Sequence, residues 1–260
     1  MQHPVFVPHG APDLPLSDIP AAQFLRDFFT HRTRPAGIVM ISAHWQSATL
    51  QLTTAPQLDT IYDFGGFGTE LHQLRYPAQT TPWLIQTTKQ ALSSNAIEVD
   101  ENPTRGLDHG AWVPLLLMLP EAKIPVVQLS LPRRASPQEL FEIGQSLSAL
   151  AAQDILVIGS GATTHNLRSL MPEGSPTPQW ATGFEAWLDQ CLRNKDWAEL
   201  FQFHSTNLGH ISHPTTEHLL PLMVIAGLSA ALPNGSLQKQ HASFSYGSIG
   251  MAAWEVQSAT

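Results

Sequence analysis

Residues 37–45 read Gly-Ile-Val-Met-Ile-Ser-Ala-His-Trp, an apolar run that leads directly into a histidine. A continuous run of branched apolar residues is typical of a strand in a parallel sheet that helices cover on both faces. A histidine at the end of such a strand presents its imidazole at the carboxyl edge of the sheet, where open α/β folds bind ligands. This stretch therefore predicts an α/β fold and a functional site that contains His44.

Apolar strands and helices alternate along the rest of the chain. Strands are predicted at residues 5–7, 37–42, 49–53, 97–99, 125–129 and 155–159. Helices are predicted at residues 21–31, 82–93, 112–119, 137–153, 179–192, 197–202 and 216–228, and a hairpin at residues 242–257 that turns at Tyr246-Gly247. This alternation favours a parallel sheet. Because no change of composition marks a linker, we expect one α/β domain over residues 1–260, with a central, mostly parallel sheet covered by helices on both faces.

The composition excludes several classes of partner. The net charge is −8 and no basic run occurs, so we expect no nucleic-acid partner. The longest apolar run, residues 219–228, contains Pro221 and is too short to cross a bilayer. The single cysteine, Cys191, allows no internal disulfide, which fits a reducing compartment. We therefore expect a cytoplasmic protein without a signal peptide and without a membrane partner. Charged residues make up only 13% of the chain. A surface with so few charges is compatible with burial of part of it in a homo-oligomer.

Four further histidines stand in positions that favour a metal site. His9 follows the strand at residues 5–7, and His165 follows the strand at residues 155–159 after several small residues. His109 has Asp108 beside it, and His218 precedes an apolar helix. Each of them has an ordinary alternative as a loop, capping or packed histidine. No pair of histidines four apart on one helix and no cysteine set occurs, which argues against a structural zinc site.

Other catalytic patterns are missing from the sequence. The segment Gly159-Ser160-Gly161 lacks the spacing of a nucleophile elbow. No glycine-rich dinucleotide fingerprint and no phosphate-binding loop follow a predicted strand. The histidines therefore carry the functional prediction: a metal held by nitrogen and oxygen ligands from distant segments, with positions left open for substrate.

Seven short phrases give the chain a resemblance to a known family. They occur in this order: Pro8-His9-Gly10-Ala11-Pro12, Ser42-Ala43-His44-Trp45, Ile61-Tyr62-Asp63-Phe64-Gly65-Gly66-Phe67, Leu107-Asp108-His109-Gly110-Ala111-Trp112, Gly159-Ser160-Gly161, His165-Asn166-Leu167-Arg168, and Pro214-Thr215-Thr216-Glu217-His218-Leu219-Leu220-Pro221. In order and spacing they resemble the class III extradiol ring-cleaving dioxygenases of the LigB superfamily, most closely the branch that contains the DOPA dioxygenases.

The resemblance implies a ligand set for one divalent metal. It assigns His9, His44 and His218 as ligands, and His165 as either a fourth ligand or a base. Distant members of the superfamily bind iron through two histidines and a glutamate, so Glu217 is the alternative to His218. The metal implied for catalysis is Fe(II), and Zn(II) is a plausible occupant of the purified protein.

The resemblance also implies an activity: opening of a catechol-type, DOPA-like aromatic ring with O2. His165 is then the base and His109 its partner in proton delivery. The small aromatic diol would be held by Trp45, Phe64 and Phe67. Two alternatives remain, a zinc-dependent hydrolase and a non-catalytic metal-binding or signalling protein on the same scaffold. Activity with Zn(II) in the absence of oxygen would identify the hydrolase, and tolerance of His165→Ala would identify the non-catalytic protein.

Overall fold

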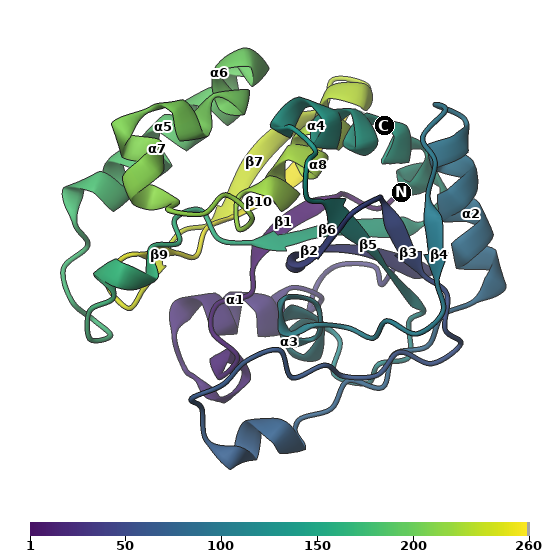
Figure 1. Cartoon of the computed structure of the whole chain (residues 1–260), viewed down its shortest axis with the longest axis horizontal. Helices are drawn as coiled ribbons and strands as arrows, with labels where there is room; N and C mark the ends of the chain where they lie inside the picture. Colours follow the sequence, from purple (N-terminus) through teal and green to yellow (C-terminus); the bar gives the residue numbers. More distant parts are fainter. Residues whose placement is uncertain (259–260) are drawn as a thin grey trace.

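The computed structural model describes residues 1–258 and is built on an eight-stranded sheet (Figure 1). The strand order is β4-β3-β5-β2-β6-β1-β10-β7. The central strands β5, β2, β6 and β1 are parallel, whereas β10 and β7 extend one side of the sheet in antiparallel pairing. The mostly parallel sheet of an α/β domain is thus confirmed. The strands are β1 (Val5–Pro8), β2 (Gly37–Ser47), β3 (Gln51–Thr53), β4 (Asp100–Asn102), β5 (Val126–Pro132), β6 (Ile155–Gly161), β7 (Ser236–His241) and β10 (Ala253–Gln257).

Helices cover both faces of this sheet, as the sequence predicted. In Figure 1, α1 and α3 lie on one side of the central strands, and α4 and α8 lie on the other. The helices are α1 (Pro20–Asp27), α2 (Pro82–Ser93), α3 (His109–Met118), α4 (Pro137–Ser146), α5 (Gln179–Asn194), α6 (Trp197–Phe201), α7 (Asn207–Ser212) and α8 (Leu220–Ala231). The short 3-10 helices are η1 (Leu14–Leu16), η2 (Thr69–Gln73), η3 (Leu147–Gln153), η4 (Leu167–Ser169) and η5 (Phe203–Ser205).

The two faces of β2 explain its unbroken apolar sequence. Val39 and Ile41 pack into the core that includes α4 and α8, whereas Ile38 and Met40 pack into the core that includes α1 and α3. Successive residues of a strand point to opposite faces, so a strand between two helical layers needs apolar residues at every position. All four side chains are buried.

β2 continues beyond its predicted end at Ser42, and its pairing becomes irregular there. Its register with β6 runs as far as Ser42 opposite Ser160. Its register with β5 shifts between Ile41 and Gln46. The intervening segment, which contains His44, is therefore released from regular pairing. This irregularity lets the strand carry a side chain into the space beyond the carboxyl ends of its neighbours.

Several predicted elements differ from the observed ones near polar residues. The predicted strand at residues 97–99 is observed at residues 100–102, where three polar residues form the edge of the sheet. The strand β7 and the helix α7 were not predicted. Residues 253–257 do not return along a hairpin but pair with β1 and β7. A short hairpin is formed instead by β8 (Phe244–Ser245) and β9 (Ile249–Gly250).

Several helix boundaries also differ from the predicted ones. The first helix ends at Asp27, and the last long helix begins at Leu220 rather than at residue 216. The helix predicted at residues 112–119 begins at His109, because the side chain of Asp108 caps it by accepting a hydrogen bond from the backbone of Ala111. The helix predicted at residues 137–153 changes to a 3-10 helix after residue 146.

Among residues 1–258, no helix is both long enough and apolar enough to cross a membrane.

Close contact between α4 and α8 generates a stability prediction. A Cβ atom on Gly144 would overlap the backbone carbonyl oxygen of Val224, which cannot move without displacing the helix. Gly144→Ala should therefore lower the free energy of unfolding by about 1–3 kcal/mol, measured by urea denaturation.

Gly183, inside α5, is the control. A Cβ atom added there would lie no closer than 3.9 Å to any neighbouring side chain, that of Leu208. Gly183→Ala should raise the free energy of unfolding by roughly 0.5–1 kcal/mol. A shift of both variants in the same direction would contradict this packing.

Candidate metal centre

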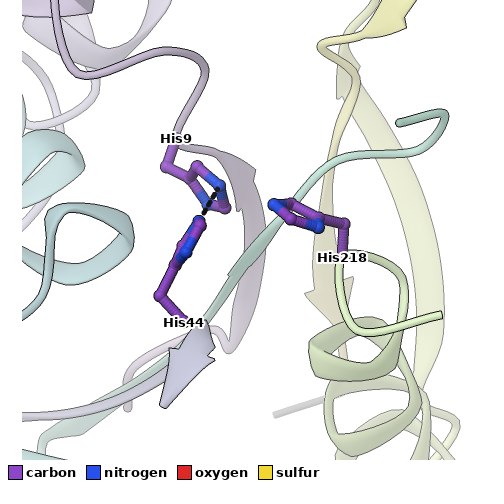
Figure 2. A group of neighbouring side chains, drawn as sticks. All are labelled: His9, His44 and His218. Atoms are coloured by element: carbon purple, nitrogen blue, oxygen red, sulfur yellow. Dashed lines mark hydrogen bonds between the residues drawn. The ribbon is translucent and has the colours of Figure 1, made fainter. Parts of the chain in front are cut away.

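Three histidines from distant segments converge at the carboxyl edge of the parallel strands (Figure 2). His9 directly follows β1, His44 lies in the irregular end of β2, and His218 lies just before α8. The Nε2 atoms of His9 and His44 are 3.1 Å apart. Each of the three rings offers a nitrogen atom within 4.8 Å of the others. This is the set that the sequence predicted as metal ligands.

Hydrogen bonds at the opposite ring nitrogen fix how His9 presents its lone pair. The Ser160 hydroxyl donates to the backbone oxygen of Gly110. It therefore accepts from His9 Nδ1–H, at 3.1 Å. His9 Nε2 is left with a lone pair that is directed at the other two histidines. Metal-binding histidines typically donate their second ring N–H in this way.

A hydrogen bond at Nδ1 orients His218 in the same manner. Its Nδ1–H donates to the carboxylate of Glu217 at 3.1 Å. Its Nε2 atom is buried and has no hydrogen-bond partner among the described residues. A buried polar atom without a partner is costly unless something else satisfies it. A cation at the three-histidine cluster would supply the missing partner, so the residues present fit a divalent metal.

Burial keeps these imidazoles neutral, which is the form that binds metals. Burial is the main cause that lowers the pKa of His9 and His218 well below the ordinary value, and the neighbouring histidines lower it further. For His44, burial followed by the proximity of His109 lowers the pKa to about 4. All three rings are therefore uncharged near neutral pH. Neutral nitrogen ligands suit Zn(II), Fe(II), Cu(II) and Ni(II).

His165 lies beside this cluster rather than within it. Its ring stacks on His218 with centroids 3.4 Å apart and ring planes 8° apart. It shares a second group of neighbouring ligand atoms with Glu217 and His218, without His9 or His44. Burial lowers its pKa to about 4, although the charge of Glu217 opposes this shift. His165 is therefore a neutral imidazole next to the cluster.

His109 is held by a carboxylate that sequence reasoning did not select. Its backbone N–H and its Nδ1–H both donate to Asp63 Oδ1, at 2.9 and 3.0 Å. Asp63 Oδ2 lies 3.7 Å from His44 Nδ1, so this one side chain faces both histidines. Burial alone would raise the pKa of Asp63, but the hydrogen bonds and charge of His109 lower it to about 2. The only signal for Asp63 was its place in the phrase at residues 61–67, just before Gly65-Gly66.

Asp108, the sequence neighbour of His109, has a different role. Its carboxylate accepts hydrogen bonds from Ser42 Oγ at 2.6 Å and from Gln128 Nε2 at 2.7 Å. It also caps α3. Asp108 is completely buried and ties the start of α3 to strands β2 and β5. It therefore positions His109 through the backbone and does not pair with the imidazole.

A cavity of about 660 Å³ opens above the histidines. His9, His44, His109, His165 and His218 line it, and Phe64 and Phe67 form part of its wall. The Phe64 ring lies 5.8 Å from the His109 ring and 5.6 Å from the Phe67 ring, in edge-to-face contacts. The two predicted aromatic residues, Phe64 and Phe67, thus lie next to the histidine cluster.

Trp45 is the predicted substrate-binding residue that the structure does not bring to this cavity. Its side chain is buried, and the guanidinium of Arg105 lies 5.4 Å from its ring centroid. Adjacent residues of a strand point to opposite sides. His44 lines the cavity, whereas its neighbour Trp45 is not among the lining residues.

Comparisons with known proteins identify the family of this chain. Residues 19–254 match the family described as the catalytic LigB subunit of aromatic ring-opening dioxygenase. The chain belongs to this family. It is 34% identical to a protein of Beta vulgaris named 4,5-DOPA dioxygenase extradiol, over 97% of this chain and 96% of that protein. It is 34% identical to an Escherichia coli K12 protein of the same name, over 86% of this chain and 83% of that protein.

The solved structures agree on the fold. The crystal structure of an uncharacterized Escherichia coli K12 protein has a TM-score of 0.82 and 28% sequence identity, and the match covers 99% of this chain and 100% of that chain. The expectations of an α/β fold and of a metal-dependent extradiol dioxygenase are confirmed at the level of the family. A hydrolase and a non-catalytic protein are not favoured.

The lowered pKa values generate a prediction for the metal-free protein. Below pH 6.5 the unfolded chain binds protons that folded His44 and His165, each with a pKa of about 4, do not bind. The free energy of unfolding should therefore fall as the pH falls from 6.5 toward 4, by up to about 1.4 kcal/mol per pH unit for each such histidine. Urea midpoints of chelator-treated protein at pH 7.5 and 5.0 measure this change.

Two variants test which histidine is responsible. In His44→Gln the free energy of unfolding should depend less steeply on pH than in wild type, whereas the exposed-site control His31→Gln should keep the wild-type dependence. Equal pH dependence of His44→Gln and wild type would contradict the assignment.

Proposed function

We propose that this protein is an Fe(II)-dependent extradiol dioxygenase that opens the ring of a catechol of the DOPA type with O2. One observation carries the proposal: ring nitrogens of three neutral histidines converge at the floor of a cavity whose wall contains Phe64 and Phe67. The two relatives named above as 4,5-DOPA dioxygenases support the substrate class.

His9, His44 and His218 are the proposed metal ligands. Glu217 is the weaker alternative to His218, because its carboxylate accepts the hydrogen bond from His218 Nδ1. A glutamate in that contact orients the histidine and supports its basicity. When bound, Fe(II) would supply the electron path from catechol to O2 and would lower the pKa of the catechol hydroxyls. The separate position of His165, outside the three-histidine group, favours its role as base over its role as fourth ligand.

The two remaining histidines divide the proton transfers between them. His165 is neutral near pH 7, so its imidazole is ready to accept a hydroxyl proton as catechol binds. His109 Nδ1–H is committed to Asp63, so His109 exchanges protons through Nε2. This pairing assigns proton acceptance to His165 and proton delivery to His109. Asp63 acts as the residue that positions His109.

Phe64 and Phe67 serve the reaction by shaping the site. Phe64 packs against His109 and Trp112, with ring centroids 5.8 and 6.3 Å apart. Phe67 is 37% exposed and lies at the outer side of the same wall. An aromatic substrate ring placed between this wall and the histidines would gain edge contacts and would displace water from the cavity.

The proposed setting is the cytoplasm. Cys191 is buried, and burial raises the pKa of its thiol to about 11, with smaller contributions from Glu199 and Asp196. A thiol with this pKa is mostly protonated at neutral pH and is therefore unreactive. A free, unreactive cysteine is compatible with a reducing compartment such as the cytoplasm.

The activity can be tested directly. Protein reconstituted with Fe(II) under anaerobic conditions and then given a catechol and air should consume O2 and form a yellow semialdehyde product. Apoprotein and Zn(II)-loaded protein are the controls, and both should be inactive. Stoichiometric Fe(II) with no turnover of any catechol in a panel would overturn the proposal. Hydrolysis by the Zn(II) form without oxygen would establish the hydrolase instead.

The roles of His44 and His109 can be separated by metal content. His44→Ala should abolish metal retention, because it removes one of the three converging ring nitrogens. His109→Ala should retain metal but reduce kcat by about 100-fold or more, the usual loss of an acid–base group. Elemental analysis and oxygen uptake measure the two properties. If both variants lose metal equally, His109 is a ligand and the division is wrong.

A further inference from the structure

The cavity contains a charged group that the proposed reaction does not use. Among the residues that line the cavity, Arg168 and Glu217 carry the permanent charges. The Glu217 carboxylate accepts hydrogen bonds from Thr215 Oγ1 at 2.8 Å and from His218 Nδ1 at 3.1 Å. The Arg168 guanidinium makes no hydrogen bond and no ion pair with any side chain or backbone group of residues 1–258. The cavity therefore presents one positive charge whose hydrogen-bond donors are all available.

The backbone of Arg168 is anchored although its side chain is not. Asn166 Oδ1 accepts a hydrogen bond from the Arg168 backbone N–H at 3.1 Å. The Asn166 Nδ2 group donates to the backbone oxygen of Ile211 at 2.7 Å. These contacts hold η4 (Leu167–Ser169), which begins two residues after His165. The site thus places an arginine at a defined point next to the proposed base.

Arg168 and the proposed metal ligands lie at different depths in the cavity. His9 and His218 are buried at its floor, with 2% and 4% of their surface exposed. Arg168 is exposed, and its neighbours Leu167 and Leu170 are 62% and 46% exposed. All of these residues line the same cavity. The cavity therefore has a floor that suits a catechol, aromatic side walls, and a cationic group at an apolar rim.

The chemistry of this rim selects a class of substituent. A guanidinium is always charged, and its planar set of donors matches a carboxylate. The chain as a whole has a net charge of −8, so this local positive charge is the feature that would draw an anion to the opening. A volume of about 660 Å³ holds a ring at the floor together with a side chain that reaches the rim.

We propose that Arg168 forms a carboxylate subsite, so that the enzyme selects catechols with an acidic side chain over neutral catechols. This inference rests on the proposed function for the ring that occupies the floor. The carboxylate binds the Arg168 guanidinium while the two hydroxyls face the histidines. Arg168 is then the residue that sets substrate specificity, and it takes no part in ring opening.

The test compares two substrates of nearly the same size and shape, 3-(3,4-dihydroxyphenyl)propionate and its uncharged primary amide. Wild-type enzyme loaded with Fe(II) should have a kcat/KM roughly 10- to 100-fold higher for the acid, the range expected of a charge-assisted hydrogen-bond pair. In Arg168→Gln this ratio should fall to near one. Arg168→Lys should retain part of the preference, because an ammonium supplies the charge without the paired donors.

Arg34→Gln is the matched control. It removes the same charge from an exposed arginine that pairs with Glu121 before the start of β2, at the opposite end of the strands. This variant should keep the acid-to-amide ratio of the wild type. If Arg168→Gln also keeps that ratio, or lowers kcat/KM equally for both compounds, the subsite is overturned.

A binding measurement separates this inference from the proposed function. Calorimetric titration of Zn(II)-loaded protein under nitrogen reports binding of the acid and the amide without turnover. Tighter binding of the acid to wild type, lost in Arg168→Gln, would support the subsite even if the Fe(II) enzyme opened neither compound. Equal affinity of wild type for the two compounds would overturn the subsite even if the enzyme opened both.

Discussion

The parallel register of β1, β6 and β2 is the constraint on which the rest of the structure depends. Pro8 pairs with Gly161, and Ser42 pairs with Ser160. The regular pairing of the three strands therefore ends at nearly the same level, and the residues that follow it must share one edge of the sheet. A slip of one residue in any of these pairings would turn every side chain of that strand to the other face. Two apolar cores prevent the slip, because each strand buries residues on both faces.

A buried polar network joins that edge to the helix that carries His109. The Ser160 hydroxyl contacts both His9 and the carbonyl of Gly110. A Cβ atom on Gly110 would overlap the Ser42 hydroxyl, so only glycine permits α3 to approach β2 this closely. Each hydroxyl in the network has a partner, which makes the network a rigid support rather than a cost. Catalytic groups held in this way need little rearrangement when a substrate binds.

The strands that were predicted correctly have both faces buried, and the elements that were missed are short or polar. The continuous apolar sequences of β2, β5 and β6 identified the centre of the sheet. β4 consists of Asp, Glu and Asn at an edge, so its pairing depends on the neighbouring strand and not on its own propensity. The α7 helix has six residues, and an isolated helix of that length is not stable. Its formation requires the packing of α5 against it.

The sequence by itself determined the fold class and the identity of the histidines, because apolar periodicity and strand-end position are local properties. The tertiary structure alone decided how the site is organised. It placed Asp63 between His44 and His109, it turned Trp45 away from the cavity, and it set His165 beside the three-histidine cluster. These outcomes depend on contacts between residues far apart in the chain and on burial that changes pKa values. Neither quantity is encoded in a short stretch of sequence.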